Sequence, residues 1–128
     1  MYDVEIWIDV VCRGEQRNET LCTLFGELKI PMRPNCGERL SFHQSKGSNF
    51  EFNLVSPIGI SKNILISVEI DDVTHYAVND NEKVLFKTSL RCREVPVASL
   101  ADARAVCTFL ANQFGLAIDP YGVNKIDE

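Results

Sequence analysis

The feature that most limits what this chain can fold into is an alternation of apolar and polar side chains with a period of two residues. It is clearest in residues 2–12, where apolar residues on one face alternate with mostly charged residues and one tryptophan on the other. A period of two is typical of a strand with one buried face. The same alternation predicts further strands at residues 20–30, 40–42, 50–54, 64–76 and 84–92.

Residues 20–30 allow two interpretations. Every second residue from Cys22 to Ile30 is apolar or glycine, as in a strand. Asn18 could instead cap a short helix that ends at Gly26. We favour the strand, because the alternation continues straight through Gly26.

Two hairpins are predicted from the turns between these strands. Residues 45–48 separate the strand at 40–42 from the strand at 50–54, whose phenylalanines give the hairpin an aromatic inner face. The polar run at residues 79–82 separates the two longest strands in the second half of the chain and predicts the second hairpin.

The last element is predicted to be a helix. Ser99 and Asp102 resemble a capping box, and Gly115 stands where a left-handed cap belongs. Between them an apolar stripe recurs at helical spacing. Its members are Leu100, Ala103, Val106, Cys107, Leu110 and Phe114.

Strands in sequence followed by one helix indicate an α+β fold. We expect a strongly bent antiparallel sheet or small barrel of about six strands, with the single C-terminal helix packed on it. Residues 1–118 would form one globular domain, and residues 119–128 a tail along its surface. Strands and helices do not alternate along the chain, so a parallel doubly wound sheet with its nucleotide-binding crevice is not expected.

Composition narrows the class of function. The chain has 128 residues, is 45% hydrophobic and carries a net charge of −5, which is typical of a globular protein and not of a disordered chain. An acidic surface argues against binding to nucleic acid or to anionic membranes. The N-terminal residues do not resemble a secretory signal, and no apolar run is long enough to span a bilayer.

The cysteines and the missing motifs point the same way. Five cysteines are scattered without a C-x-x-C pair, as expected of reduced thiols in a cytoplasmic protein. The sequence contains no glycine-rich phosphate loop, no G-x-S-x-G elbow and no H-E-x-x-H helix motif. We therefore expect no cofactor, and enzymatic activity is not indicated.

A metal site is one of the constellations that we considered. Glu69, Asp71 and His75 share one face of their strand if no bulge intervenes, and two carboxylates with one histidine can bind a divalent metal. A solvated outer face accounts for the same residues more simply, and a bulge at Asp71 would separate them. No metal is therefore predicted.

Two of the thiols have distinct expected environments. Cys92 lies between Arg91 and Arg93, but adjacent strand residues point to opposite faces, so we expect it to be a buried, apolar residue. Cys36 lies in a predicted turn and should be the thiol that reacts first with a reagent.

Aromatic residues on otherwise polar faces suggest an interface. Trp7 stands between two acidic residues, Phe25 lies on the polar side of the second strand, and Phe109 lies nearly opposite the apolar stripe of the helix. Such residues often mark a binding surface, although both sheet faces could instead be covered or one aromatic singly exposed. The leading hypothesis is a small non-enzymatic binding or interaction module that forms a homodimer through these three anchors, with a protein or small molecule as a further possible partner.

The alternative hypothesis is a small-molecule binding protein or a modest enzyme. Its cleft would lie between the sheet and the C-terminal helix. Its polar groups would be Tyr76, Asp72, Thr74 and His43.

Overall fold

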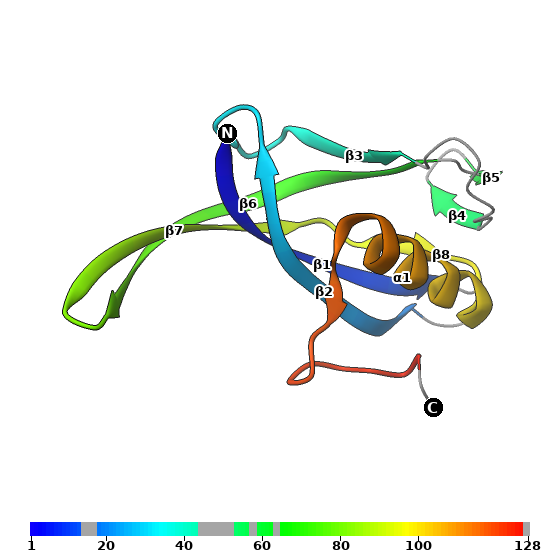
Figure 1. The fold of residues 1–128 in the computed structure, drawn as a ribbon. Coiled ribbons are helices and arrows are strands. Elements are labelled where there is room, and N and C mark those ends of the chain that lie inside the picture. Colours follow the sequence, from blue (N-terminus) through cyan, green and yellow to red (C-terminus); the bar gives the residue numbers. More distant parts are fainter. Residues whose placement is uncertain (14–17, 44–52, 57–58, 63–64, 127–128) are drawn as a thin grey trace.

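The structure is a computed structural model that describes residues 1–13, 18–43, 53–56, 59–62 and 65–126 (Figure 1). Strands come first, and one helix lies near the C-terminus. In chain order the elements are β1 (Tyr2–Arg13), β2 (Asn18–Ile30), β3 (Arg39–His43), β4 (Asn53–Ser56), β5 (Gly59–Lys62), β6 (Leu65–Asp80), β7 (Lys83–Cys92), β8 (Val95–Val97), α1 (Leu100–Phe114) and β9 (Ala117–Ile118).

The strands form one strongly curved sheet around β1. One edge of β1 pairs antiparallel with β2, from Tyr2↔Ile30 to Arg13↔Asn18. Its other edge pairs parallel with β7 and then with β8. The predicted α+β class, the curved sheet and the C-terminal helix are confirmed. The sheet is mixed and not purely antiparallel as predicted, because β1 pairs in parallel with β7 and β8. Alternation does not indicate this, because side chains alternate in the same way in parallel and antiparallel strands.

The favoured strand interpretation of residues 20–30 is confirmed by β2. The second predicted hairpin is also confirmed, because β6 and β7 pair antiparallel down to Asp80↔Lys83. Asn81 and Glu82 form its two-residue loop with φ values of 48° and 68°. Positive φ at both loop positions matches the right-handed twist of the strands that such a turn connects.

The first predicted hairpin is not the pairing that the structure shows. β3 pairs with β6, whereas β4 pairs with β5 and with β8. The predicted turn, together with Phe50 and Phe52, lies outside the described residues. Alternation located both strands but carries no information about which strand each one meets.

The helix begins and ends where the sequence predicts. The Ser99 hydroxyl accepts a hydrogen bond from the Asp102 backbone N–H at 3.2 Å, and Gly115 adopts a left-handed conformation with φ of 74°. α1 has 15 residues, and no helix in the described ranges has the length and apolar character needed to span a membrane.

The core lies between α1 and the face of the sheet that carries Val4, Ile6 and Ile8. The expected position of Phe109 outside this core is wrong: the residue is 0% exposed and its ring packs edge-on against Phe114, with centroids 5.7 Å apart. The curved sheet wraps partly around the helix (Figure 1), so that a wider arc of α1 is buried than the single stripe read from its sequence.

The segment after α1 runs back along β2. β9 pairs with β2, the Lys125 N–H donates to the Leu21 carbonyl at 2.7 Å, and Ile126 is buried. Where the chain leaves the helix, a Cβ on Gly26 would lie 2.6 Å from Leu116 Cδ2. The glycine in the middle of β2 therefore permits a close approach of the helix end to the sheet.

Candidate functional site

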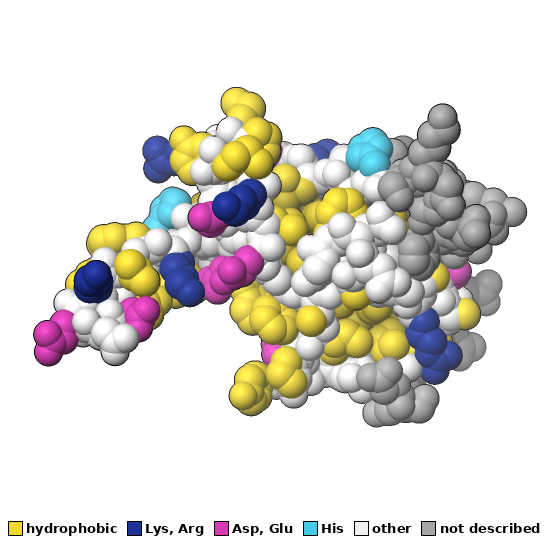
Figure 2. Space-filling view, in the orientation of Figure 1, with side chains coloured by type: hydrophobic (Ala, Val, Ile, Leu, Met, Phe, Trp, Pro, Cys, Tyr) yellow, Lys and Arg dark blue, Asp and Glu magenta, His cyan; other side chains and the backbone are white. Residues whose placement is uncertain are grey.

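Beyond the core, β6 and β7 continue as a projecting two-stranded ribbon, which we call the arm (residues 71–89; Figure 1). Ile70 and Leu90 are buried, whereas every residue between them is at least partly exposed. The space-filling view shows the arm standing clear of the body, with hydrophobic, basic and acidic side chains side by side (Figure 2). An isolated two-stranded ribbon is marginally stable in water, and further packing against another surface would stabilise it.

The tip of the arm is apolar on both faces. Val84, Leu85 and Phe86 are 62%, 43% and 79% exposed. Consecutive strand residues point to opposite sides, so Val84 and Phe86 lie on one face of the arm and Leu85 on the other. Exposed apolar surface surrounded by charge is typical of an interaction site.

The base of the same strand is buried and chemically inert. Leu90 and Cys92 share a face with Phe86, but both are buried in the hydrophobic core. Burial raises the pKa of the Cys92 thiol to about 12, against a lowering effect of Arg91 and a raising effect of Asp71. The expectation that Cys92 is a buried apolar residue agrees with this environment, and Cys36 is exposed as expected.

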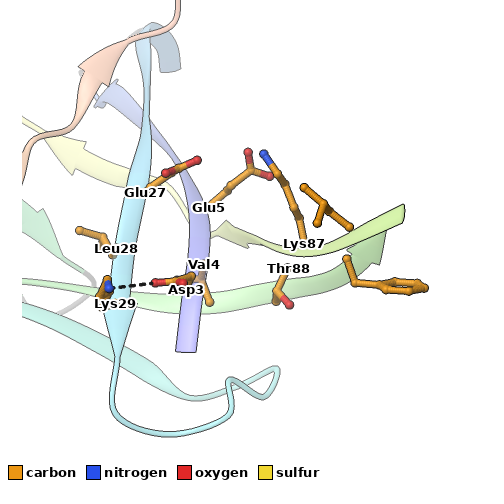
Figure 3. Close-up of a pocket in the computed structure, with 10 residues that line it drawn as sticks. Asp3, Val4, Glu5, Glu27, Leu28, Lys29, Lys87 and Thr88 are labelled. Carbon is orange, nitrogen blue, oxygen red and sulfur yellow. Dashed lines mark ion pairs between the residues drawn. The ribbon is translucent and has the colours of Figure 1, made fainter. Parts of the chain in front are cut away.

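A gap opens where β7 leaves β1 to form the arm. The parallel pairing of these strands covers only Glu5–Trp7 and Ser89–Arg91. Before these residues the strands diverge, and they enclose a hollow of about 620 Å³ (Figure 3). We call it the β1–β7 gap. It is lined by residues 3–5 of β1, 27–29 of β2 and 85–88 of β7.

The two strands that border the gap each have a backbone edge that faces it. β1 pairs with β2 on its opposite edge, and β7 pairs with β6 on its opposite edge. In the described part of the chain, residues 2–4 and 83–88 have no strand partner on the gap side. The lining includes Val4 from the core face and Glu5 from the other face, so the gap passes through the plane of the sheet. An extended strand is the ligand that suits such an edge.

Charged groups surround the β1 side of the gap (Figure 3). Lys29 Nζ lies 3.8 Å from Asp3 Oδ1. The Tyr76 hydroxyl donates a hydrogen bond to Glu5, and Glu27 lies directly opposite Glu5 on β2. The hydrogen bond to Glu5, then desolvation and the charges of the two glutamates, raise the pKa of Tyr76. The tyrosine thus remains a hydrogen-bond donor that ties the arm to β1.

Two of the three predicted interface residues form a stack beside this site. Trp7 and Phe25 lie opposite each other on β1 and β2, with ring centroids 5.1 Å apart and an interplanar angle of 18°. Both are half-buried on the face of the sheet opposite α1, near the ion pair of Arg91 Nη2 with Asp9 Oδ2 at 2.5 Å. Phe109 is separated from them, in the core.

The four predicted ligand-binding residues do not meet under the helix, where core residues fill the space. Tyr76 and Thr74 lie on the arm, and the Thr74 hydroxyl donates to Asp72 Oδ2 at 3.1 Å. His43 is exposed on β3, because its neighbour Phe42 turns inward to pack against the helix. The expected cleft between sheet and helix is therefore misplaced, since the strand that carries three of these residues leaves the body.

The proposed metal triplet is divided by a bulge. Arg93 Nε contacts Glu69 Oε2 at 2.6 Å and Asp71 Oδ1 at 3.5 Å. The register of β6 shifts at Asp71, so His75 turns to the other face and its Nδ1 lies 2.9 Å from the Thr88 hydroxyl. Within the described ranges no three histidine, cysteine or acidic side chains group as metal ligands.

Sequence reasoning missed both the exposed tip and the gap. A signal for the tip was present: Val84, Leu85 and Phe86 are three consecutive apolar residues that break the alternation directly after a turn. A strand with one buried face normally carries polar residues on its solvent-exposed face, so apolar residues on both faces are unusual. The gap has no such signal, because it depends on where a parallel pairing between distant strands stops.

Comparison of the chain with protein-family models found no match, and comparisons with curated proteins and with solved structures found none either.

Proposed function

We propose that this chain is a non-enzymatic interaction module that forms a homodimer, and that the arm is its main contact. The observation that carries the proposal is the combination, in one stretch of β7, of an open backbone edge and an apolar tip exposed on both faces. An edge supplies hydrogen bonds to a partner strand, and apolar side chains on both faces supply surface to bury.

The distribution of charge makes the tip of the arm the surface at which a second copy can dock. The chain as a whole carries a net charge of −5, so two copies repel each other over most of their surfaces. The tip of the arm is balanced, with Asp80 and Glu82 against Lys83 and Lys87. Two identical acidic chains can therefore approach at this tip at the least electrostatic cost.

Symmetry limits the possible register of the two β7 strands. A two-fold axis between antiparallel strands places one residue opposite its own copy, and each residue that precedes it then lies opposite the residue that follows it at the same spacing. An axis at Leu85 would place Lys83 opposite Lys87 of the partner subunit, which is an unfavourable like-charge pair. An axis at Phe86 avoids this contact and pairs the two Phe86 rings. It also keeps the pairing within Val84–Thr88, inside the open edge.

Cross-linking tests this register directly. In a Cys36→Ser background, Phe86→Cys should form an intermolecular disulfide under mild oxidation at a protein concentration high enough to offset the lost ring, because directly opposite residues have Cα atoms about 4.5–5.5 Å apart. Leu85→Cys is the matched control and should cross-link much less, since its copies are displaced along the strands. Cross-linking of Leu85→Cys instead would leave the dimer but overturn the register.

Light scattering tests the dimer itself. The expected mass is twice 14.4 kDa, and Phe86→Ser should weaken association at least about tenfold, because it removes a central aromatic contact. Tyr121→Ser is the matched control: Tyr121 is an aromatic residue with 97% exposure that lies outside the arm. A wild-type chain that stays monomeric at high concentration would overturn the proposal.

The Trp7–Phe25 stack is retained as a second anchor of this interface. It lies on β1 and β2 at the base of the gap, and both rings are partly exposed. Trp7→Ala should weaken association more than it lowers stability. Trp7 fluorescence should shift to the red as the dimer dissociates on dilution. A Trp7→Ala variant that remains fully dimeric would remove this anchor and leave the arm as the contact.

A small-molecule site is the second candidate, and the volume of the gap favours it. About 620 Å³ falls within the range of about 300–1,000 Å³ that is typical of ligand sites. The ligand would sit between β1 and β7, with Tyr76 and Lys87 as its polar contacts, and not under the helix. A small-molecule thermal-shift screen distinguishes the two functions: hits that Lys87→Ala abolishes, on a monomeric protein, support the ligand site.

A further inference from the structure

Two buried cysteines from distant parts of the chain lie side by side. Cys22 on β2 and Cys107 on α1 are 85 residues apart in sequence, yet their sulfur atoms are 3.3 Å apart. Cys22 is 0% exposed and Cys107 is 6% exposed. Any small apolar side chain could fill either position in the core. Contact between two sulfur atoms, however, is the arrangement from which a disulfide forms.

We propose that Cys22 and Cys107 form an oxidation site that closes to a disulfide when the protein meets a peroxide. The S–S bond is about 2.05 Å long, so the two sulfurs need to approach by only about 1.3 Å in total. Small adjustments of the two side chains suffice for such a movement. The helix already packs on the sheet, and both cysteines belong to the same hydrophobic core.

The reaction takes place in two balanced steps. The Cys107 sulfur, the more exposed of the pair, attacks one peroxide oxygen, the O–O bond breaks, and a sulfenic acid and one water molecule form. The Cys22 sulfur then attacks the sulfenic sulfur, the S–O bond breaks, and the proton of Cys22 leaves with the hydroxide as a second water molecule. Two thiols lose two electrons in total, and one hydrogen peroxide is reduced to two water molecules.

The disulfide would join α1 to β2 and close a long loop. Cys22 lies opposite Val10 and bridges to Asn124, at the end of β2 away from the β1–β7 gap. The bond would hold the helix and the C-terminal segment against the sheet and leave the arm unaltered. A cross-link across 85 residues restricts the unfolded chain strongly, so the oxidised protein should be the more stable form.

The experiment uses the full chain with Cys36→Ser, to remove the exposed thiol. Hydrogen peroxide should lower the mass by that of two hydrogens, and digestion without reductant should yield one peptide pair that contains residues 22 and 107. Tm should rise by roughly 10 °C and return when dithiothreitol is added. Because both thiols are buried, we expect oxidation over minutes to hours.

Two variants separate this pair from the other thiols. Cys92→Ala removes a buried cysteine on β7 and should keep the full peroxide response. Cys107→Ala should abolish the rise in Tm and the linked peptide. If the native chain instead gains only oxygen atoms, or yields no 22–107 peptide under conditions that oxidise Cys36, the proposal is overturned even where Cys107→Ala folds poorly.

Discussion

The base and the tip of the β6–β7 hairpin have the same secondary structure, but the base is buried and the tip is exposed. At the base, Leu90 is 0% exposed and packs in the core. Four residues earlier on the same face of β7, Phe86 is 79% exposed. Alternation assigns both residues to one face of one strand. Whether that face is covered depends on how far the helix and β1 extend along it, and both end before the tip.

An apolar strand face is therefore not equivalent to a core face. The base contributes to the stability of the fold, and the tip has surface available for another molecule. Substitutions at matched positions of the two regions should therefore differ in what they change.

The largest contrast is expected between Leu90→Ala and Val84→Ala. Truncation of the buried Leu90 leaves a cavity and should lower the free energy of unfolding by about 3 kcal/mol. Val84 is largely exposed, so its truncation should change stability by less than about 0.5 kcal/mol in dilute, monomeric protein. Urea unfolding at low protein concentration measures both values, and similar losses at the two sites would break the comparison.

Alkaline pH probes the base through Cys92. Its pKa is about 12 in the folded chain against 9.0 ordinarily, so the folded state favours the protonated thiol. The resulting stabilisation is fully present below pH 9 and is lost as the pH rises from 9 toward 12. Tm should fall between pH 9 and 10.5 more steeply in the native chain than in Cys92→Ala, which has no thiol to ionise. An equal dependence of Tm on pH in the two proteins would show that the Cys92 thiol is not shielded from water.

The contact between helix and sheet is tested at Gly26. Gly26→Ala places a Cβ 2.6 Å from Leu116 Cδ2, in a buried site where Leu116 has little room to move. Overpacking of this kind should cost about 1–3 kcal/mol of stability. Gly122→Ala is the matched control, since a Cβ there would lie 3.4 Å from its nearest neighbour, Asp119 Oδ2, which is ordinary contact distance. A neutral Gly26→Ala would indicate that the helix end yields easily.

The smallest effect is expected at the turn that closes the arm. Glu82 adopts a φ of 68°, a conformation that glycine adopts without strain. Glu82→Gly should stabilise the hairpin by roughly 0.5–1 kcal/mol, measured by thermal unfolding. Asn81→Gly should gain less, because asparagine tolerates positive φ better than glutamate. A larger gain from Asn81→Gly than from Glu82→Gly would contradict the assignment of the strain to Glu82.

Local patterns predicted a large part of the fold. The limits of α1 followed from Ser99 and Gly115, and the β6–β7 turn from the polar run at residues 79–82. The short strands β5, β8 and β9 were missed, because segments of two to four residues are too short to show a period. The arm tip and the β1–β7 gap were missed; of the three residues predicted to form an interface, Trp7 and Phe25 lie together and Phe109 lies apart in the core.

The sequence alone determined the type of each main element, where it begins and ends, and which of its residues share a face. Periodicity, caps and turns act over a few neighbouring residues. Only the tertiary structure decided which strands meet, that β1 pairs in parallel with β7, and that this pairing stops at Glu5. The β1–β7 contacts join residues more than eighty positions apart, and no local pattern records them. The arm, the β1–β7 gap and the contact of Cys22 with Cys107 all arise at this level.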